Sequence, residues 1–348
     1  MKFFQPNAQP AQPQKNKGFA KFALLPLLMA SSMMATTAQA QTLCVFDLSG
    51  TSGDYFAFMK DYALAAQKWS VMIDLKAYNK EEQAIHDYKL GKCDAVSATS
   101  FSTREFNKFT GSINAVGAIP SNTVARNLLL LLGHPKLAPD MVENGHEAIG
   151  AIPIGSAYLT IKDRNVNDLI KIEGKRVGVL ASDPVQRRMI TQVGGEPVLM
   201  QVDTAILKVQ DPTVDIVPLP SYSFDAFELY RALGNKGGIA RFPISFMTMN
   251  VIAHQNAFPK TFGAQSRAWF AAQSPRLMKK IQYYDDKVPA RYWFDIPADN
   301  QVAYFQLIRK MRLEFVQNQT YHPKMMHLLK RLRCQQNPQE PECKTRDE

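Results

Sequence analysis

The sequence of 348 residues lacks the short motifs of common catalytic and nucleotide-binding sites. It contains no Gly-x-Gly-x-x-Gly or Gly-x-x-x-x-Gly-Lys-Ser/Thr loop, no Gly-x-Ser-x-Gly nucleophile turn and no His-Glu-x-x-His pair. Its six histidines are dispersed along the chain, and the acidic pair Asp285-Asp286 is expected at a solvated helix end. We therefore expect no catalysis, no cofactor and no metal site.

Long apolar runs are also missing after residue 40, where the strongest, at 128–132, has five residues. Residues 1–40 have the pattern of a secretory signal peptide: a lysine-containing start, an apolar stretch at 22–34 and the small-x-small sequence Ala38-Gln39-Ala40. The alternative is a membrane anchor, but 13 apolar residues fall short of the roughly 20 that a span needs. We expect export to the periplasm, cleavage near Ala40 and a mature chain that does not span the membrane.

The composition is that of a globular protein, with 46% apolar, 21% charged and 10% aromatic residues. The length favours two domains. The formal net charge of +10 falls to +6 without the four lysines of the first 40 residues, which contain no acidic residue. A balance of this size is sufficient for solubility and does not require nucleic acid as a partner.

Four cysteines in an exported chain favour disulfide bonds, and four cysteines allow three connectivities. Cys44 and Cys93 each open an expected strand, and parallel neighbours would place them side by side. Cys334 and Cys343 flank a loop rich in Gln and Pro. We therefore predict the pairs Cys44–Cys93 and Cys334–Cys343, with a metal site as the alternative, which no Cys-x-x-Cys supports.

Short apolar strands alternate with amphipathic helices along the chain, which is typical of parallel α/β sheets. Strands are expected at 43–48, 71–77, 93–99, 175–180, 197–202 and 214–219, and an extended segment at 242–253. Helices are expected from Asp54 and at 80–90, 183–193, 224–233, 261–285 and 299–317. We predict two α/β domains with a hinge and an interdomain cleft: residues 41–150 plus 246–318 as domain I, 151–245 as domain II and 319–348 as a peripheral tail.

Two sequence runs, in this order and in an exported α/β chain, carry a family resemblance: Tyr88-Lys89-Leu90-Gly91-Lys92-Cys93-Asp94 and Ile172-Glu173-Gly174-Lys175-Arg176-Val177-Gly178-Val179. Over about residues 43–318 the chain resembles the solute-binding proteins of TRAP-type transporters, the DctP-like class. It is similar to a divergent branch, some of whose members are described as RND-type efflux components linked to aminoglycoside resistance. The resemblance implies a fold like that of type II periplasmic binding proteins.

The chain departs from this family at one position. The family's second strand usually carries an arginine that grips a ligand carboxylate, and Gly178 stands there in this chain. Arg176 lies two residues earlier, further from the expected cleft. The resemblance therefore leaves open whether the solute is an organic acid, or a cationic or neutral polar molecule.

Ligands of open α/β sheets bind beyond the carboxyl ends of the strands. The polar residues at these places are the predicted ligand-binding set, with two arginines as substitutes for the missing clamp: Asp47, Ser49, Thr51, Thr99, Ser100, Arg126, Asp183, Gln186, Tyr222 and Arg241. The structural alternatives are that Asp47 and Asp183 cap turns or helices and that Tyr222 only packs.

We predict a periplasmic protein that captures a small polar solute in the cleft and delivers it to membrane transporter subunits. The alternative is a non-catalytic accessory protein of an envelope efflux or stress complex. In that alternative the basic stretch at 324–333 would be a docking face.

Overall fold

The computed structural model describes residues 40–348. The expected signal peptide therefore lies outside the described residues, apart from Ala40. No helix in residues 40–348 has the length and apolar character needed to cross a membrane.

The N-terminal part of the sheet is parallel and follows the predicted alternation. Strand β1 (Gln41–Phe46) pairs in parallel with β2 (Ile73–Tyr78) on one side and β3 (Ala95–Thr99) on the other. Helices α1 (Asp54–Gln67) and α2 (Glu81–Lys89) make the two crossovers. Both helices bury aromatic side chains, such as Tyr62 and Tyr88, because their apolar positions recur at helical spacing. The predicted β-α-β-α-β order is confirmed.

A second parallel part repeats this arrangement. Strand β6 (Arg176–Leu180) pairs with β7 (Glu196–Met200) and β8 (Ile216–Pro220), and helices α6 (Pro184–Gln192) and α7 (Ala205–Gln210) connect them. The single helix predicted at 224–233 is wrong. The structure has two short helices there, α8 (Ser223–Ala226) and α9 (Leu229–Leu233). They are separate because Glu228 has a left-handed backbone with φ of 51°, which a right-handed helix cannot contain.

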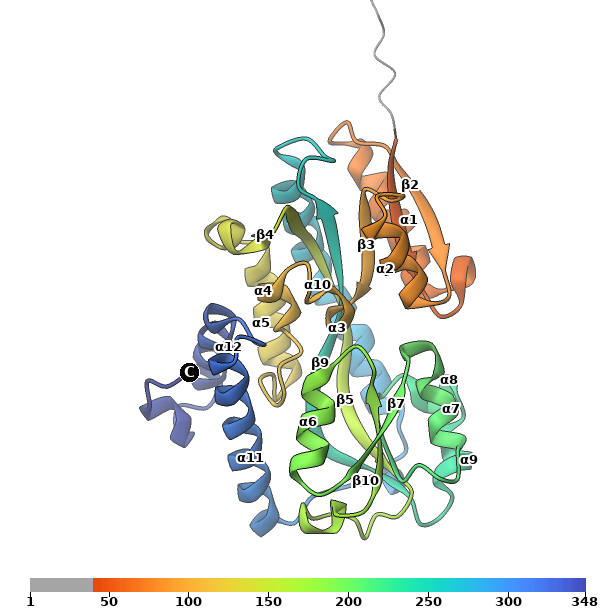
Figure 1. Cartoon of the computed structure of the whole chain (residues 1–348), viewed down its shortest axis with the longest axis vertical. Coiled ribbons are helices and arrows are strands. Elements are labelled where there is room, and N and C mark those ends of the chain that lie inside the picture. Colours follow the sequence, from red (N-terminus) through yellow and green to blue (C-terminus); the bar gives the residue numbers. More distant parts are fainter. Residues whose placement is uncertain (1–39) are drawn as a thin grey trace, which may run out of the picture. The chain divides into compact units, whose positions relative to one another are not determined.

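Two long antiparallel strands join the parallel parts, as Figure 1 shows. They are β5 (His146–Ile161) and β9 (Gly238–His254), and they occupy the middle of the sheet order β2-β1-β3-β9-β5-β8-β6-β7. The extended segment predicted at 242–253 is confirmed as part of β9, whereas β5 was not predicted. Their pairing register shifts at four places: between Ala148 and Gly150, Pro153 and Gly155, Ala157 and Tyr158, and Tyr158 and Thr160. The shift between Pro153 and Gly155 lies between the stretch of β9 that pairs with β3 and the stretch of β5 that pairs with β8.

The remaining elements cover the sheet or extend from its edges. The long helices at 262–287 and 298–317 agree with the predicted 261–285 and 299–317. The short strand β4 (Val142–Glu143) pairs with β5, and the short strand β10 (Trp293–Phe294) pairs with β9. The elements not yet introduced are α3 (Ser100–Thr103), α4 (Lys108–Gly111), α5 (Asn122–Leu132), α10 (Phe262–Lys287), α11 (Ala298–Gln317), α12 (Pro323–Gln336), and the 3-10 helices η1 (Gly50–Ser52), η2 (Pro135–Met141), η3 (Ile170–Ile172), η4 (Val202–Thr204), η5 (Ala290–Tyr292) and η6 (Pro341–Lys344).

Both predicted disulfides are present. Cys44 of β1 is bonded to Cys93, which precedes the neighbouring strand β3, with 5.9 Å between the Cα atoms. Cys334 of α12 is bonded to Cys343 of η6, with 5.6 Å between the Cα atoms. The metal alternative finds no support in residues 40–348, where no three potential ligand side chains cluster.

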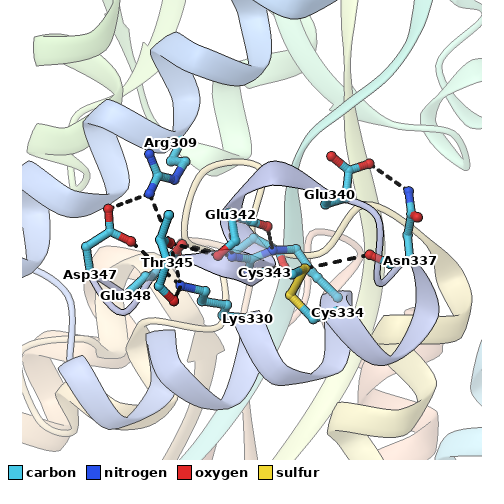
Figure 2. Close-up of a disulfide and its surroundings, with 12 residues drawn as sticks. Arg309, Lys330, Cys334, Asn337, Glu340, Glu342, Cys343, Thr345, Asp347 and Glu348 are labelled. Carbon is cyan, nitrogen blue, oxygen red and sulfur yellow. Dashed lines mark hydrogen bonds and ion pairs between the residues drawn. A yellow bond between two sulfur atoms is a disulfide. The ribbon is translucent and has the colours of Figure 1, made fainter.

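The last 30 residues are packed onto the fold through buried charges. Arg312 of α11 and Arg333 of α12 are both about 95% buried, and each pairs with the carboxylates of Glu342 and Glu348 at 2.6–3.0 Å. Figure 2 shows Glu342 next to the Cys334–Cys343 disulfide and Glu348 near Lys330. Lys330 is also buried and donates to the Thr345 carbonyl at 3.0 Å. Two of the four basic residues of the suggested docking face are therefore inside the protein.

Candidate functional site

A cavity of about 410 Å³ is lined by β6 from Val177 to Leu180, by β8 and by the segments that follow these strands. Its volume falls within the range of small-molecule sites in proteins. Both parallel parts of the sheet contribute to its wall: Leu48, Asn79 and Phe101 from the first, and the segments after β6 and β8 from the second. Most of the wall is apolar, and it includes Val179, Val185, Met189, Ile190, Leu219 and Ile244.

Asp183 is the predicted site residue that is most deeply placed in this wall. It precedes Pro184, the first residue of α6, and its carboxylate accepts a hydrogen bond from the Val185 backbone N–H at 3.2 Å. The helix cap therefore uses one oxygen. The same oxygen pairs with Arg104 at 3.0 Å, so Asp183 has a second role beyond the cap.

Gln186 and Tyr222 also line the cavity. The Gln186 side-chain oxygen accepts from the Leu180 backbone N–H at 2.9 Å and so fixes the turn between β6 and α6. Burial raises the pKa of Tyr222 to about 12, and the nearby negative charge of Asp47 adds to this rise. The phenol of Tyr222 is therefore neutral at physiological pH and carries a proton that it can donate to a solute.

The predicted residues of the β1 and β3 ends do not line the cavity. The Asp47 carboxylate accepts hydrogen bonds from the backbone N–H groups of Ser49, Tyr55 and Phe56 at 2.9–3.0 Å. Since Tyr55 and Phe56 lie in the first turn of α1, Asp47 caps the start of this helix. Ser49 and Thr51 are exposed. Thr99 and Ser100 are buried: the Thr99 N–H donates to Glu81, and the Ser100 hydroxyl accepts from Asn114, which itself lines the cavity.

Neither predicted substitute for the arginine clamp reaches the wall. Arg126 is exposed on α5, and Arg241 is exposed and paired with Asp295 at 3.3 Å. Gly178 does line the cavity, but a Cβ there would lie 3.0 Å from the Met200 sulfur, so a larger side chain would crowd this methionine. Arg176 is exposed at the opposite, amino-terminal end of β6.

Arg104 is the residue that sequence reasoning missed. It ends the short helix α3, its side chain is 10% exposed, and it contacts three residues of the wall: Asp183, Asn114 and the ring of Tyr321. No motif surrounds it, and its partner Asp183 is 79 residues away. The only available signal was that it follows β3, at the sheet edge where ligands bind.

Comparison with known proteins shows the family to which the chain belongs. The family model described as solute-binding protein AdeT 1/2 matches residues 63–348. The protein named "Probable solute-binding protein AdeT1" from Acinetobacter baumannii is 42% identical over 304 residues, covering 87% of this chain and all of the relative. "Probable solute-binding protein AdeT2" from the same organism is 34% identical over 233 residues, covering 67% of this chain and 98% of the relative.

Solved structures of TRAP periplasmic solute-binding proteins share the fold. One from Ralstonia eutropha, with bound (S)-2-acetolactate, has a TM-score of 0.66 and 12% identity, covering 85% of this chain and 99% of that one. Another from Haemophilus influenzae, with bound L-gulonate, has a TM-score of 0.64 and 11% identity, covering 84% and 98%. The expected two-domain α/β fold of periplasmic binding proteins is confirmed.

Proposed function

Since the chain belongs to the AdeT 1/2 family of solute-binding proteins, we propose that it captures a small solute in the cavity beside Asp183 and presents it to a membrane transporter. The solute is bound and released without chemical change. We also propose that the protein works in the periplasm, after export directed by residues 1–40. The observation that carries this proposal is the cavity itself, which has the size of a ligand site and receives side chains from both parallel parts of the sheet.

The course of the chain supports a division into two domains about this cavity. We propose the limits stated above, with 41–150 and 246–318 on one side and 151–245 on the other. Among the described strands, only β5 and β9 run continuously through both parallel parts of the sheet, and the register shift between Pro153 and Gly155 lies between these parts. A bend at this shift would open and close the cavity.

The accessory-protein alternative gains little from the basic stretch at 324–333. Lys330 and Arg333 are buried and paired within the chain, so two of its four lysines and arginines are not available for docking. The family and the cavity favour solute binding, which we retain as the function.

Native mass spectrometry of the protein purified from the periplasm, without unfolding, tests the proposal. We expect a mass above that of the bare chain, with the extra mass released as a small molecule when the protein is denatured. The control is Ala157→Phe, which puts an aromatic ring on a residue of the cavity wall and should remove the extra mass. A bare mass for the wild type, together with no rise in melting temperature across a broad library of small molecules, would refute the proposal.

A further inference from the structure

The guanidinium of Arg104 is held by the protein itself. Its Nε donates to the Gly111 carbonyl at 2.9 Å, and its two terminal nitrogens donate to Asp183 Oδ1 at 3.0 Å and Asn114 Oδ1 at 2.5 Å. The ring of Tyr321 lies 5.5 Å from the guanidinium carbon. All three nitrogens of Arg104 thus have partners within the protein.

Arg104 does not itself line the cavity, and Asp183, which does, already takes one of its terminal nitrogens. An acidic solute would have to displace it, and Asp183, with a side chain 3% exposed, would then be a buried charge without a partner. Breaking one side of a buried ion pair in this way is strongly unfavourable. The arrangement therefore selects against carboxylates at this position.

Lys80, Asp183 and Asp203 are the charged side chains that line the cavity. Asp183 is paired with Arg104, whereas Lys80 is exposed and Asp203 is half-buried. A charged solute would therefore lose its hydration on entering this mainly apolar space and find no buried, unpaired counter-charge there.

We infer that the cavity takes a neutral, mainly apolar solute and that the Arg104–Asp183 pair sets this preference. This inference rests on the proposed function and names its substrate class. It differs from the expectation of a polar solute, because the sequence pattern identified the polar strand ends and not the apolar side chains between them. Neutral polar groups such as the phenol of Tyr222 then orient the solute, while burial of its apolar surface supplies the affinity.

Two fluorescent dyes with the same aromatic frame test the inference directly. N-phenyl-1-naphthylamine is neutral, and 8-anilinonaphthalene-1-sulfonate is the same amine with one sulfonate. For the wild-type protein we expect the dissociation constant of the neutral dye to be lower by at least ~10-fold. Ala157→Phe should abolish binding of the neutral dye, which would place that dye in the cavity.

Variants at the ion pair locate the cause of the preference. Asp183→Asn keeps a good helix cap but leaves Arg104 without its counter-charge, so the preference for the neutral dye should fall by at least ~10-fold. The double variant Arg104→Gln/Asp183→Asn removes both charges and should restore the wild-type preference. The matched control is Asp295→Asn, which removes an exposed aspartate from its pair with Arg241 and should change nothing.

The outcomes separate the two proposals. If the wild type binds the sulfonate as tightly as the neutral dye, or if Asp183→Asn leaves the preference unchanged, the inference about solute charge is overturned and solute binding stands. If neither dye binds, or if binding survives Ala157→Phe, the inference about a neutral, mainly apolar solute in this cavity is overturned, and the native mass of the purified protein decides on solute binding separately.

Discussion

Removal of the Cys44–Cys93 disulfide should destabilise the protein more than removal of Cys334–Cys343. The cysteines of the first pair are 49 residues apart and those of the second pair are 9 apart. On the chain-entropy model, a disulfide raises the free energy of the unfolded chain because it closes a loop. The rise is about 4 kcal/mol for the longer loop and about 3 kcal/mol for the shorter one. For a folded chain of about 300 residues, these values correspond to falls in melting temperature of roughly 6 °C and 4 °C.

The assay is thermal unfolding of two double variants, Cys44→Ala/Cys93→Ala and Cys334→Ala/Cys343→Ala, with and without a reducing agent. Without reductant each variant should melt below the wild type, the first by the larger amount. Because Cys44 and Cys93 are fully buried, loss of their sulfur atoms adds a packing cost in the same direction. With reductant the wild type should fall toward the variants. Equal melting temperatures of the wild type and the first variant under oxidising conditions would refute the reasoning.

Two further predictions concern single side chains. Burial alone raises the pKa of Glu342, but the buried arginines beside it lower that pKa from 4.5 to about 2. Its contribution to stability is therefore present above pH 4.5 and lost as the pH falls toward 2. Urea unfolding of Glu342→Gln should depend less on pH in this window than unfolding of the half-buried control Glu340→Gln, and equal dependence would contradict this. A Cβ on Gly53 would overlap the buried carboxylate of Asp47, so Gly53→Ala should lower the free energy of unfolding by about 2 kcal/mol or more, whereas the exposed control Ser52→Ala should change it little. Equal stability of these two variants would show that the cap is not disturbed.

The parts of the fold that were predictable are those whose signals are local. The strands and helices of both parallel parts have helical or alternating apolar spacing and clear boundary signals, such as Gly91 after one helix and Pro184 at the start of another. The Cys44–Cys93 disulfide followed from the expectation that two neighbouring strands open with cysteines, and Cys334–Cys343 from the loop that these two cysteines flank. β5 was missed because it is buried along nearly all of its length and contains Pro153 and Gly155, so it shows neither alternation nor the composition of a regular strand.

The site was predictable only where its residues directly follow a strand. Asp183 and Gln186 were found in this way, and their place in the cavity wall agrees with the general rule for open α/β sheets. Arg104 was missed because its role depends on a contact between residues 79 positions apart. The apolar character of the wall was missed for a related reason, since apolar residues at strand ends have the same sequence pattern as an ordinary core.

Hydrogen–deuterium exchange with the solute released from the native protein tests the central claim most directly. The account predicts slower amide exchange at 178–190 and 219–224, around the cavity, and unchanged exchange in α12 at 323–336. With free solute at 100 times its dissociation constant, openings that require release of the solute should become about 100-fold rarer. Protection confined to α12, or no protection at any position, would contradict the account.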